Sequence, residues 1–134
     1  MANALYDKGR EGFLDGSIDW DTDTIKVALI DTGVYTVNLS THDMWDDASA
    51  GVIGTPQTLG TKTVTAGVAD AADATFTAVT GATVEALIIY KDTGTPSTSR
   101  LIAYIDTATG LPVTPNGGDI TVAWDSGANK IFKL

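Results

Sequence analysis

His42 is the only histidine in this sequence, and its imidazole could act as a general base. Because the chain has no cysteine, a Cys-His pair is excluded, and a Ser-His-Asp arrangement would have to use this imidazole. The sequence contains no Gly-x-Ser-x-Gly nucleophile turn. Asp43, Met44 and Trp45 follow in a short stretch, which favours a surface histidine, or one buried at a subunit contact, over a catalytic one.

The aspartates Asp19, Asp21 and Asp23 are spaced as at the start of a calcium-binding loop. A helix–loop–helix calcium loop needs glycine at its sixth position and glutamate at its twelfth, where this chain has Thr24 and Ile30. That motif is excluded, so a solvated acidic turn is favoured and a looser calcium site is the alternative. The same interpretation applies to a second acidic cluster, Asp43, Asp46 and Asp47.

The tryptophans Trp20, Trp45 and Trp124 could form a platform for sugar rings. A tryptophan near the end of a strand belongs more often to a core or an interface, and we favour that interpretation. Trp20-Asp21 and Trp124-Asp125 each begin a polar turn that leads to a lysine beside aliphatic residues. We interpret them as two similar turns that could lie close in space. The carboxylate spacing selects no pair for glycoside hydrolysis, and no catalytic, cofactor-binding or metal-binding residue is predicted.

A hairpin at residues 84–106 is the element around which the chain is organised. Residues 84–90 and 100–106 are short runs rich in Ile, Leu, Val and Tyr on either side of a polar loop, which indicates strands. Alternate residues of the first run are apolar on both faces, with Leu87 and Ile89 on one and Ala86, Ile88 and Tyr90 on the other. A strand of this kind must be covered on both faces, which places it at the centre of a sheet.

Before this hairpin, a helix is predicted at residues 3–15, capped by Asn3 and ended by Gly16. Residues 24–31 are predicted to form a strand, and residues 34–39 a second short strand or extended segment.

The next segments are less regular. Thr41 is expected to cap a single helical turn over residues 42–47. Residues 48–60 are expected to be the least regular part of the chain, with short edge pieces at residues 52–53 and 57–59 around Pro56, which belongs at an edge or bend. Residues 61–68 and 73–79 alternate in the manner of strands.

After the central hairpin, residues 107–118 form a long loop of turn-forming composition, a kind that is often functional. A C-terminal hairpin is predicted at residues 119–134, with Ile120, Val122 and Trp124 on one face. This hairpin and strand 25–30 are the expected covers for one face of the central hairpin. Strand 73–79 or a partner subunit is expected to cover the other.

The composition narrows the class of protein. A chain of 134 residues is expected to fold as one domain, residues 1–134. Its net charge of −9 argues against a nucleic-acid partner and favours solubility or docking on a basic surface. No signal peptide and no run long enough to cross a membrane is expected. These observations predict an all-β fold, an antiparallel β-sandwich or flattened barrel of about seven to nine strands, with one short N-terminal helix.

Several stretches of the chain resemble a family of small virion structural proteins of tailed bacteriophages. The resembling stretches are residues 1–14, 18–20, 25–27, 67–73, 85–94, 101–106, 117–122 and 130–132, and the resemblance is weakest over residues 40–62. The family implies a non-enzymatic head- or tail-associated component without a cofactor, located in the virion and assembled in the host cytoplasm. Within it, a capsid cement (decoration) protein is the first expectation.

A cement protein of this family would bridge capsid subunits. The resemblance therefore implies a major capsid protein or other virion protein as partner and a homo-oligomer, with a trimer favoured. The residues expected at an interface come from helix 3–15, from residues 42–45 and from loop 107–118: Leu5, Tyr6, Arg10, Phe13, His42, Met44, Trp45, Leu111 and Val113. The alternatives are a tail-associated structural protein and a receptor-binding module that binds host glycans.

Overall fold

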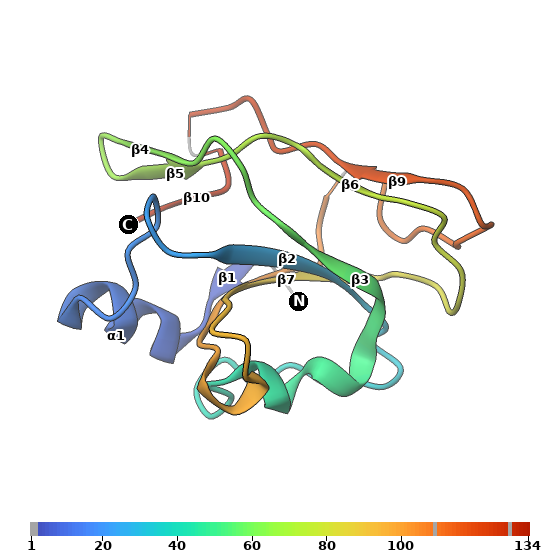
Figure 1. The fold of residues 1–134 in the computed structure, drawn as a ribbon, viewed down its shortest axis with the longest axis horizontal. Helices are drawn as coiled ribbons and strands as arrows, with labels where there is room; N and C mark the ends of the chain where they lie inside the picture. Colours follow the sequence, from blue (N-terminus) through green and yellow to red (C-terminus); the bar gives the residue numbers. More distant parts are fainter. Residues whose placement is uncertain (1–2, 109, 129) are drawn as a thin grey trace.

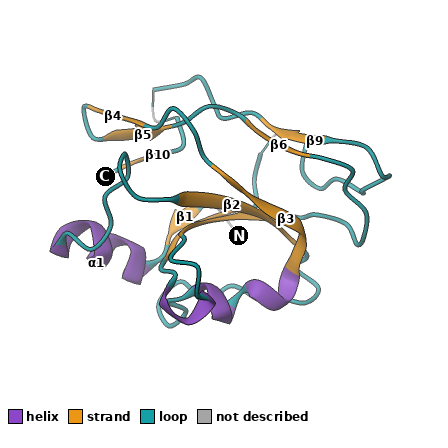
Figure 2. Ribbon diagram, viewed as in Figure 1, coloured by secondary structure: helices purple, strands orange, loops and turns teal. Residues whose placement is uncertain are grey.

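The computed structural model describes residues 3–108, 110–128 and 130–134 (Figure 1). Regular structure in these residues is mostly strand, with one α-helix, α1 (Asp7–Asp15), near the N-terminus (Figure 2). The ten strands are β1 (Ala4–Leu5), β2 (Ile25–Ile30), β3 (Val52–Thr58), β4 (Thr63–Thr65), β5 (Val68–Asp70), β6 (Ala74–Phe76), β7 (Ala86–Lys91), β8 (Leu101–Ile105), β9 (Ile120–Val122) and β10 (Phe132–Lys133). Three single 3-10 turns cover Trp45–Asp47, Ser49–Gly51 and Pro96–Thr98. The expected all-β fold with one short helix is confirmed.

A five-stranded antiparallel sheet in the order β1-β8-β7-β2-β3 forms the scaffold. β7 lies at its centre and pairs with β2 from Lys91 opposite Ile25 to Ala86 opposite Ile30. β7 and β8 form the predicted central hairpin, and side chains of β7 are buried on both faces of the sheet. Because β2 is a neighbour of β7 within the sheet, the expectation that strand 25–30 covers a face of the hairpin is wrong.

One face of this sheet, here called the strand-covered face, lies under two small sheets, β10-β5-β4 and β6-β9 (Figure 1). Leu87 and Ile89 of β7 point to this side and pack in one core with Phe76 and Ala74 of β6. Strand 73–79 was expected on the opposite side of the hairpin. Its apolar residues instead join the same layer as β9.

The predicted C-terminal hairpin does not form. β9 pairs with β6, with Phe76 opposite Ile120, and β10 pairs with β5, with Phe132 opposite Ala69. Alternation had correctly placed Ile120, Val122 and Trp124 against one core. Alternation determines which side chains point inward, but it does not determine which neighbouring strand supplies the backbone hydrogen bonds.

The predicted strand at residues 61–68 is split into β4 and the start of β5, which form a tight hairpin with Thr65 opposite Val68. Ala66 has a φ of 53°, so the backbone turns there instead of continuing as a strand. This split, the unpredicted β1 and the continuous strand β3 bring the number of strands above the expected range.

The other face of the sheet, here called the loop-covered face, lies under residues 31–51 and their 3-10 turns (Figure 2). Tyr35 and Trp45 of this segment pack with Ile88 and Tyr90 of β7 in a second core. Trp45 stacks on Tyr90 with the ring centroids 4.3 Å apart and the planes 5° from parallel. Residues 34–39 form no strand, because they cross this face as a cover and do not extend the sheet.

β3 corrects the expectation that residues 48–60 are irregular. It runs for seven residues at the edge of the large sheet and pairs with β2. Pro56 lies on this edge strand, as predicted. The short edge pieces predicted at residues 52–53 and 57–59 lie at the two ends of this one strand. They were not joined in the prediction because Gly54, with a φ of 69°, and Pro56 interrupt the pattern, and the register shifts there between Val27 and Leu29 of β2.

Helix α1 begins at Asp7 and not at residue 3. β1 precedes it and pairs with β8, and Asn3 does not cap the helix. The Asn3 side-chain oxygen instead accepts the backbone N–H groups of Asp106 and Thr107, each at 3.0 Å. Gly16 ends the helix with a φ of 81°, as predicted.

The helix also lies unusually close to the sheet. A Cβ atom at Gly9 would lie 2.8 Å from the Leu101 carbonyl oxygen and 2.9 Å from the Ile102 Cα atom, so only glycine permits this approach.

Candidate functional site

The residues expected at an interface do not form one surface. Leu5, Tyr6 and Trp45 are buried in the chain's own cores, so the isolated chain does not present them to a partner. Their apolar character, which suggested an interface, serves the fold itself. The others are partly or fully exposed and lie in three places: Arg10 and Phe13 on α1, His42 and Met44 by the 3-10 turns, and Leu111 and Val113 in loop 107–118.

The helical turn near His42 begins later than predicted. It covers Trp45–Asp47 and follows Met44, whose backbone N–H lies near a side-chain oxygen of Asp47 at 3.5 Å. The Asp47 carboxylate also accepts the Asp43 N–H at 2.9 Å, so it does the capping that was expected of Thr41. The reason is that Asp47 lies at the end of this turn, so its carboxylate can accept the backbone N–H groups at the start of the turn.

His42 is tied into a hydrogen-bond chain that leads to the core. Its Nδ1 atom lies 3.2 Å from the Asn38 backbone nitrogen, which can only donate, so Nδ1 is the unprotonated acceptor. The Tyr35 hydroxyl, 2.8 Å from the same Nδ1, then donates to it and accepts the O–H of Tyr6 at 2.8 Å. Both hydrogen bonds to His42 Nδ1 come from residues 35–42, so they stabilise the conformation of this segment over the sheet.

The two phenols of this chain are held in their neutral form. Burial, with the hydrogen bond that Tyr6 donates to Tyr35, raises the pKa of Tyr6 far above its ordinary range. Burial also raises the pKa of Tyr35, although the hydrogen bond that it accepts from Tyr6 acts in the opposite direction. Neither phenol is therefore poised to act as a base near neutral pH.

The acidic turn at residues 19–23 is closed by its own side chains. The Asp23 carboxylate accepts the Asp19 N–H at 2.7 Å and pairs with Lys91 Nζ at 3.1 Å. The interaction between the other two carboxyl groups lowers the pKa of Asp19 and raises the pKa of Asp21, as expected for neighbouring carboxyls that lose their protons one after the other. Within the described part of the chain, no three His, Asp or Glu side chains are grouped as metal ligands, so the looser calcium site gains no support.

Trp20 and Trp124 approach the same segment from two sides. The Trp20 indole N–H donates to the Asp70 carbonyl oxygen at 3.1 Å, and that of Trp124 donates to the Ala72 carbonyl oxygen at 3.0 Å. The two turns that share a Trp-Asp start are therefore close in space, as the sequence suggested. Only Trp124 is partly exposed, since Trp20 and Trp45 are 4% and 7% exposed and cannot offer a face to a sugar ring.

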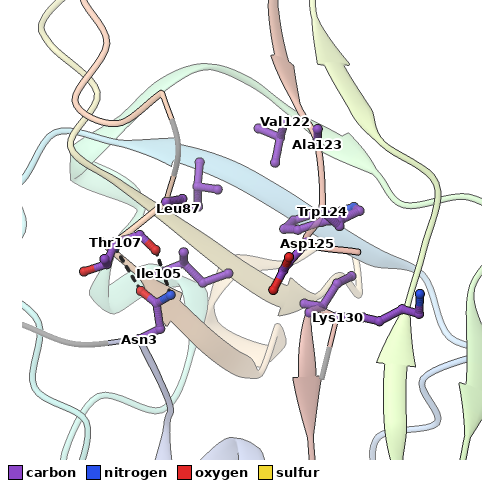
Figure 3. Close-up of a pocket in the computed structure, with 11 residues that line it drawn as sticks. Asn3, Leu87, Ile105, Thr107, Val122, Ala123, Trp124, Asp125 and Lys130 are labelled. Carbon is purple, nitrogen blue, oxygen red and sulfur yellow. Dashed lines mark hydrogen bonds between the residues drawn. The ribbon is translucent and has the colours of Figure 1, made fainter. Parts of the chain in front are cut away.

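A pocket of about 390 Å³ opens between the end of β8 and the chain that follows β9 (Figure 3). Leu87, Ile105 and Val122 form its apolar part. Trp124 and Asp125 lie across the pocket from Ile105, as Figure 3 shows. An aromatic ring beside a carboxylate is an arrangement that could bind a polar ligand with an apolar face, such as a sugar.

A second hollow, here called the α1 groove, lies between the end of α1 and the β10-β5-β4 sheet, and has a volume of about 320 Å³. Its lining is mainly apolar: Phe13, Ile18, Trp20, Val64, Ala69, Phe132 and Leu134. Val64 and Leu134 are 56% and 61% exposed. The sequence analysis missed both residues. The alternation Thr63-Val64-Thr65 was a usable signal, because it places the valine on the face opposite to the threonines.

Within residues 3–108, 110–128 and 130–134, no helix combines the length and the apolar character that a membrane span requires. Comparison of the chain with protein-family models and with curated proteins yields no match.

Proposed function

We propose that this chain is a non-enzymatic structural component of a tailed-phage virion, in the first place a capsid cement protein. The observation that carries this proposal is that the side chains best suited to chemistry are engaged in internal contacts. The His42 lone pair accepts from Asn38 and Tyr35, and the Asp23 carboxylate pairs with Lys91 and closes its own turn.

The scaffold is consistent with a mechanical role. Residues 85–94 and 101–106 are among the most recognisable stretches of the family resemblance. They contain β7 and β8, which are buried in the middle of the molecule. A sheet packed on both faces by its own chain is a rigid block that can carry binding surfaces at its rims. The net charge of −9 favours attachment to a basic surface of a major capsid protein or another virion protein, and we expect a homo-oligomer, in the first place a trimer.

Locating the protein in purified particles tests this proposal. We expect peptides of this chain in particles purified by density gradient, and density for its five-stranded sheet on the capsid shell in a cryo-electron microscopy reconstruction. Density at the tail alone would favour the tail-associated alternative. Particles without the protein would overturn the virion proposal altogether.

A second candidate function, binding of host glycans by a receptor-binding module, is favoured by the pocket in Figure 3. Trp124 is the tryptophan to test, because Trp45 is buried against Tyr90. On a glycan array, Trp124→Ala should remove binding that Trp45→Phe retains, since the second variant keeps an aromatic ring in the core. An array without signal for the unmodified protein would argue against this candidate.

A further inference from the structure

We propose that the α1 groove is the docking site for an apolar side chain flanked by lysine or arginine on a partner protein. The inference rests on the proposed function, because it names the surface by which the chain would attach to a virion protein. It is argued from the walls of the groove, from its rigidity and from the charges around it.

The walls of the groove offer apolar surface that the fold itself does not cover. Val64 projects from β4 and Leu134 follows β10, and both are more than half exposed. Ile18 and Trp20, each 4% exposed, form the floor between them. Burial of this surface by a partner would be favourable, because it removes apolar side chains from water.

The floor of the groove is held in place before any partner arrives. Phe132 packs edge-on against Trp20, with the ring centroids 5.2 Å apart, and lies 5.7 Å from the Phe13 ring. The hydrogen bond from the Trp20 indole to the Asp70 carbonyl oxygen fixes the indole. A preformed groove loses little side-chain freedom when it is filled, which favours binding.

The charges next to the groove determine the chemistry of the partner. Asp19 and Asp21 line it, and Asp15 ends α1, where the helix dipole is also negative. Among the described residues, neither Asp19 nor Asp21 forms an ion pair with a cation within 4.0 Å, whereas the nearby Lys91 is paired with Asp23. Because both carboxylates line the groove, a lysine or guanidinium group placed there could lie beside the two of them.

Two lysines lie near the groove. The Lys133 side chain lies beside Gly67, which lines the opposite wall. Lys62 donates to the Asp23 carbonyl oxygen and acts on the charge of Asp21. Asp15, Asp19 and Asp21 still outnumber Lys62 at their end. The groove is therefore acidic at the end formed by residues 19–21 and not along its whole length.

The basic flank of a partner should lie over that end, with its apolar side chain between Val64 and Leu134. A second copy of this chain is the less favoured occupant of this groove, because its 17 acidic residues outnumber its 8 basic ones and the acidic end calls for a basic flank. The proposed homo-oligomer would use another surface.

Methyl chemical shifts in NMR spectra test the proposal without a virion. The probes are the peptides acetyl-Lys-Leu-Lys-amide and acetyl-Glu-Leu-Glu-amide, added to protein labelled at Ile, Leu and Val methyl groups. We expect the first peptide to shift the Ile18, Val64 and Leu134 signals, to bind at least about fivefold more tightly than the second, and to lose that preference in 0.5 M NaCl.

Matched variants localise the effect. Val64→Asn should weaken the lysine peptide several-fold, whereas Val34→Asn, at a valine with nearly the same exposure of 59%, should not. Asp21→Asn should reduce the preference for the lysine peptide, whereas Asp46→Asn, at another exposed aspartate, should leave it unchanged. Equal affinities for both peptides, equal effects of the two valine variants, or signals that shift only with protein concentration would overturn the proposal.

The same valine pair separates this inference from the proposed function. Incorporation of Val34→Asn but not Val64→Asn into particles would support both. Equal incorporation of the two variants would leave the chain a virion component and remove the α1 groove as its attachment site. Peptide binding by a protein absent from particles would retain the groove and overturn the virion role.

Discussion

The two faces of the five-stranded sheet are closed in different ways. The loop-covered face is covered by residues 31–51, which follow directly on β2 and lead into β3, with large aromatic rings and a chain of hydrogen bonds that leads from His42 into the core. The strand-covered face is closed by short strands gathered from residues 63–133. The α1 groove and the pocket in Figure 3 both lie on this second side.

The two faces differ in what lines their hollows. A hollow of about 440 Å³ on the loop-covered face is lined mainly by polar residues, among them Thr32, Thr36 and Glu85. The α1 groove instead retains the exposed apolar side chains Val64 and Leu134, while Tyr6 and Trp45 of the loop-covered face are buried. Partner binding is therefore expected on the strand-covered face, and stability should depend more strongly on single residues of the loop-covered face.

The largest expected contrast is between two tryptophans. Trp45→Ala should lower the free energy of unfolding by about 3–5 kcal/mol, because it leaves a cavity against Tyr90. Trp124→Ala should cost only about 1–2 kcal/mol, because the Trp124 side chain is only half-buried. Urea unfolding followed by circular dichroism measures both values. Equal losses would remove the contrast between the faces.

At the contact of α1 with β8, Gly9→Ala should destabilise the protein by about 2–4 kcal/mol, since the new methyl group would meet backbone atoms that cannot yield separately. Gly60→Ala is the matched control, because its methyl group would meet nothing within 4 Å, and we expect a change within about 0.5 kcal/mol. Thermal melts compare the two. A Gly9→Ala protein as stable as the control would mean that the helix lies farther from the sheet.

The direction of the hydrogen bonds on the loop-covered face predicts unequal effects of two similar substitutions. Tyr35→Phe removes the acceptor of the buried Tyr6 O–H and should cost about 1–3 kcal/mol. Tyr6→Phe should cost less, about 0.5–1.5 kcal/mol, because Tyr35 still donates to His42. Chemical denaturation measures the free energy of unfolding of both variants. A larger cost for Tyr6→Phe would reverse the assigned direction.

High pH should lower the free energy of unfolding through Tyr90 on the loop-covered face. Burial, with the nearby charge of Asp92, raises the pKa of Tyr90 to about 12, while an unfolded tyrosine titrates near 10. The unfolded state therefore loses its proton first, so stability is fully present below about pH 10 and falls as the pH rises towards 12. Near pH 11, Tyr90 alone should account for about 1 kcal/mol.

Tyr90→Phe is the control for this pH effect, because it keeps a ring to stack on Trp45 but has no phenol to titrate. Stability measured between pH 9 and pH 11 should fall less for the variant than for the unmodified protein. Parallel curves would exclude Tyr90 as a source of the effect.

The central hairpin could be predicted from the sequence because both of its strands are unbroken runs of apolar residues, so neither helix nor loop competes with the strand assignment. β3 could be predicted only as two short edge pieces, because Gly54 and Pro56 interrupt an edge strand that needs few inward-facing side chains. The beginning of α1 was placed too early because Asn3 is a good capping residue in isolation. Its partners at Asp106 and Thr107 are about a hundred positions away, where local sequence gives no signal.

The candidate sites were harder to predict for the same physical reason. Apolar residues such as Tyr6, Trp45 and Val64 look alike in sequence, whether they fill a core or remain at the surface. The tertiary fold determines which of them are buried. β4 pairs with β5 and leaves Val64 exposed, while the cover formed by residues 31–51 buries Trp45. Until the neighbours of each strand are known, burial cannot be assigned.

The positions of the tryptophans give the molecule a separate fluorescent reporter for each layer. Trp45 lies against Tyr90 under the loop, whereas Trp20 and Trp124 both donate to the segment at residues 70–72 on the other side. A Trp45→Phe protein would emit only from the strand-covered face. A protein with both other tryptophans replaced would emit only from the loop-covered face. Stopped-flow refolding of the two could therefore show whether the continuous loop or the assembled strands close over the sheet first.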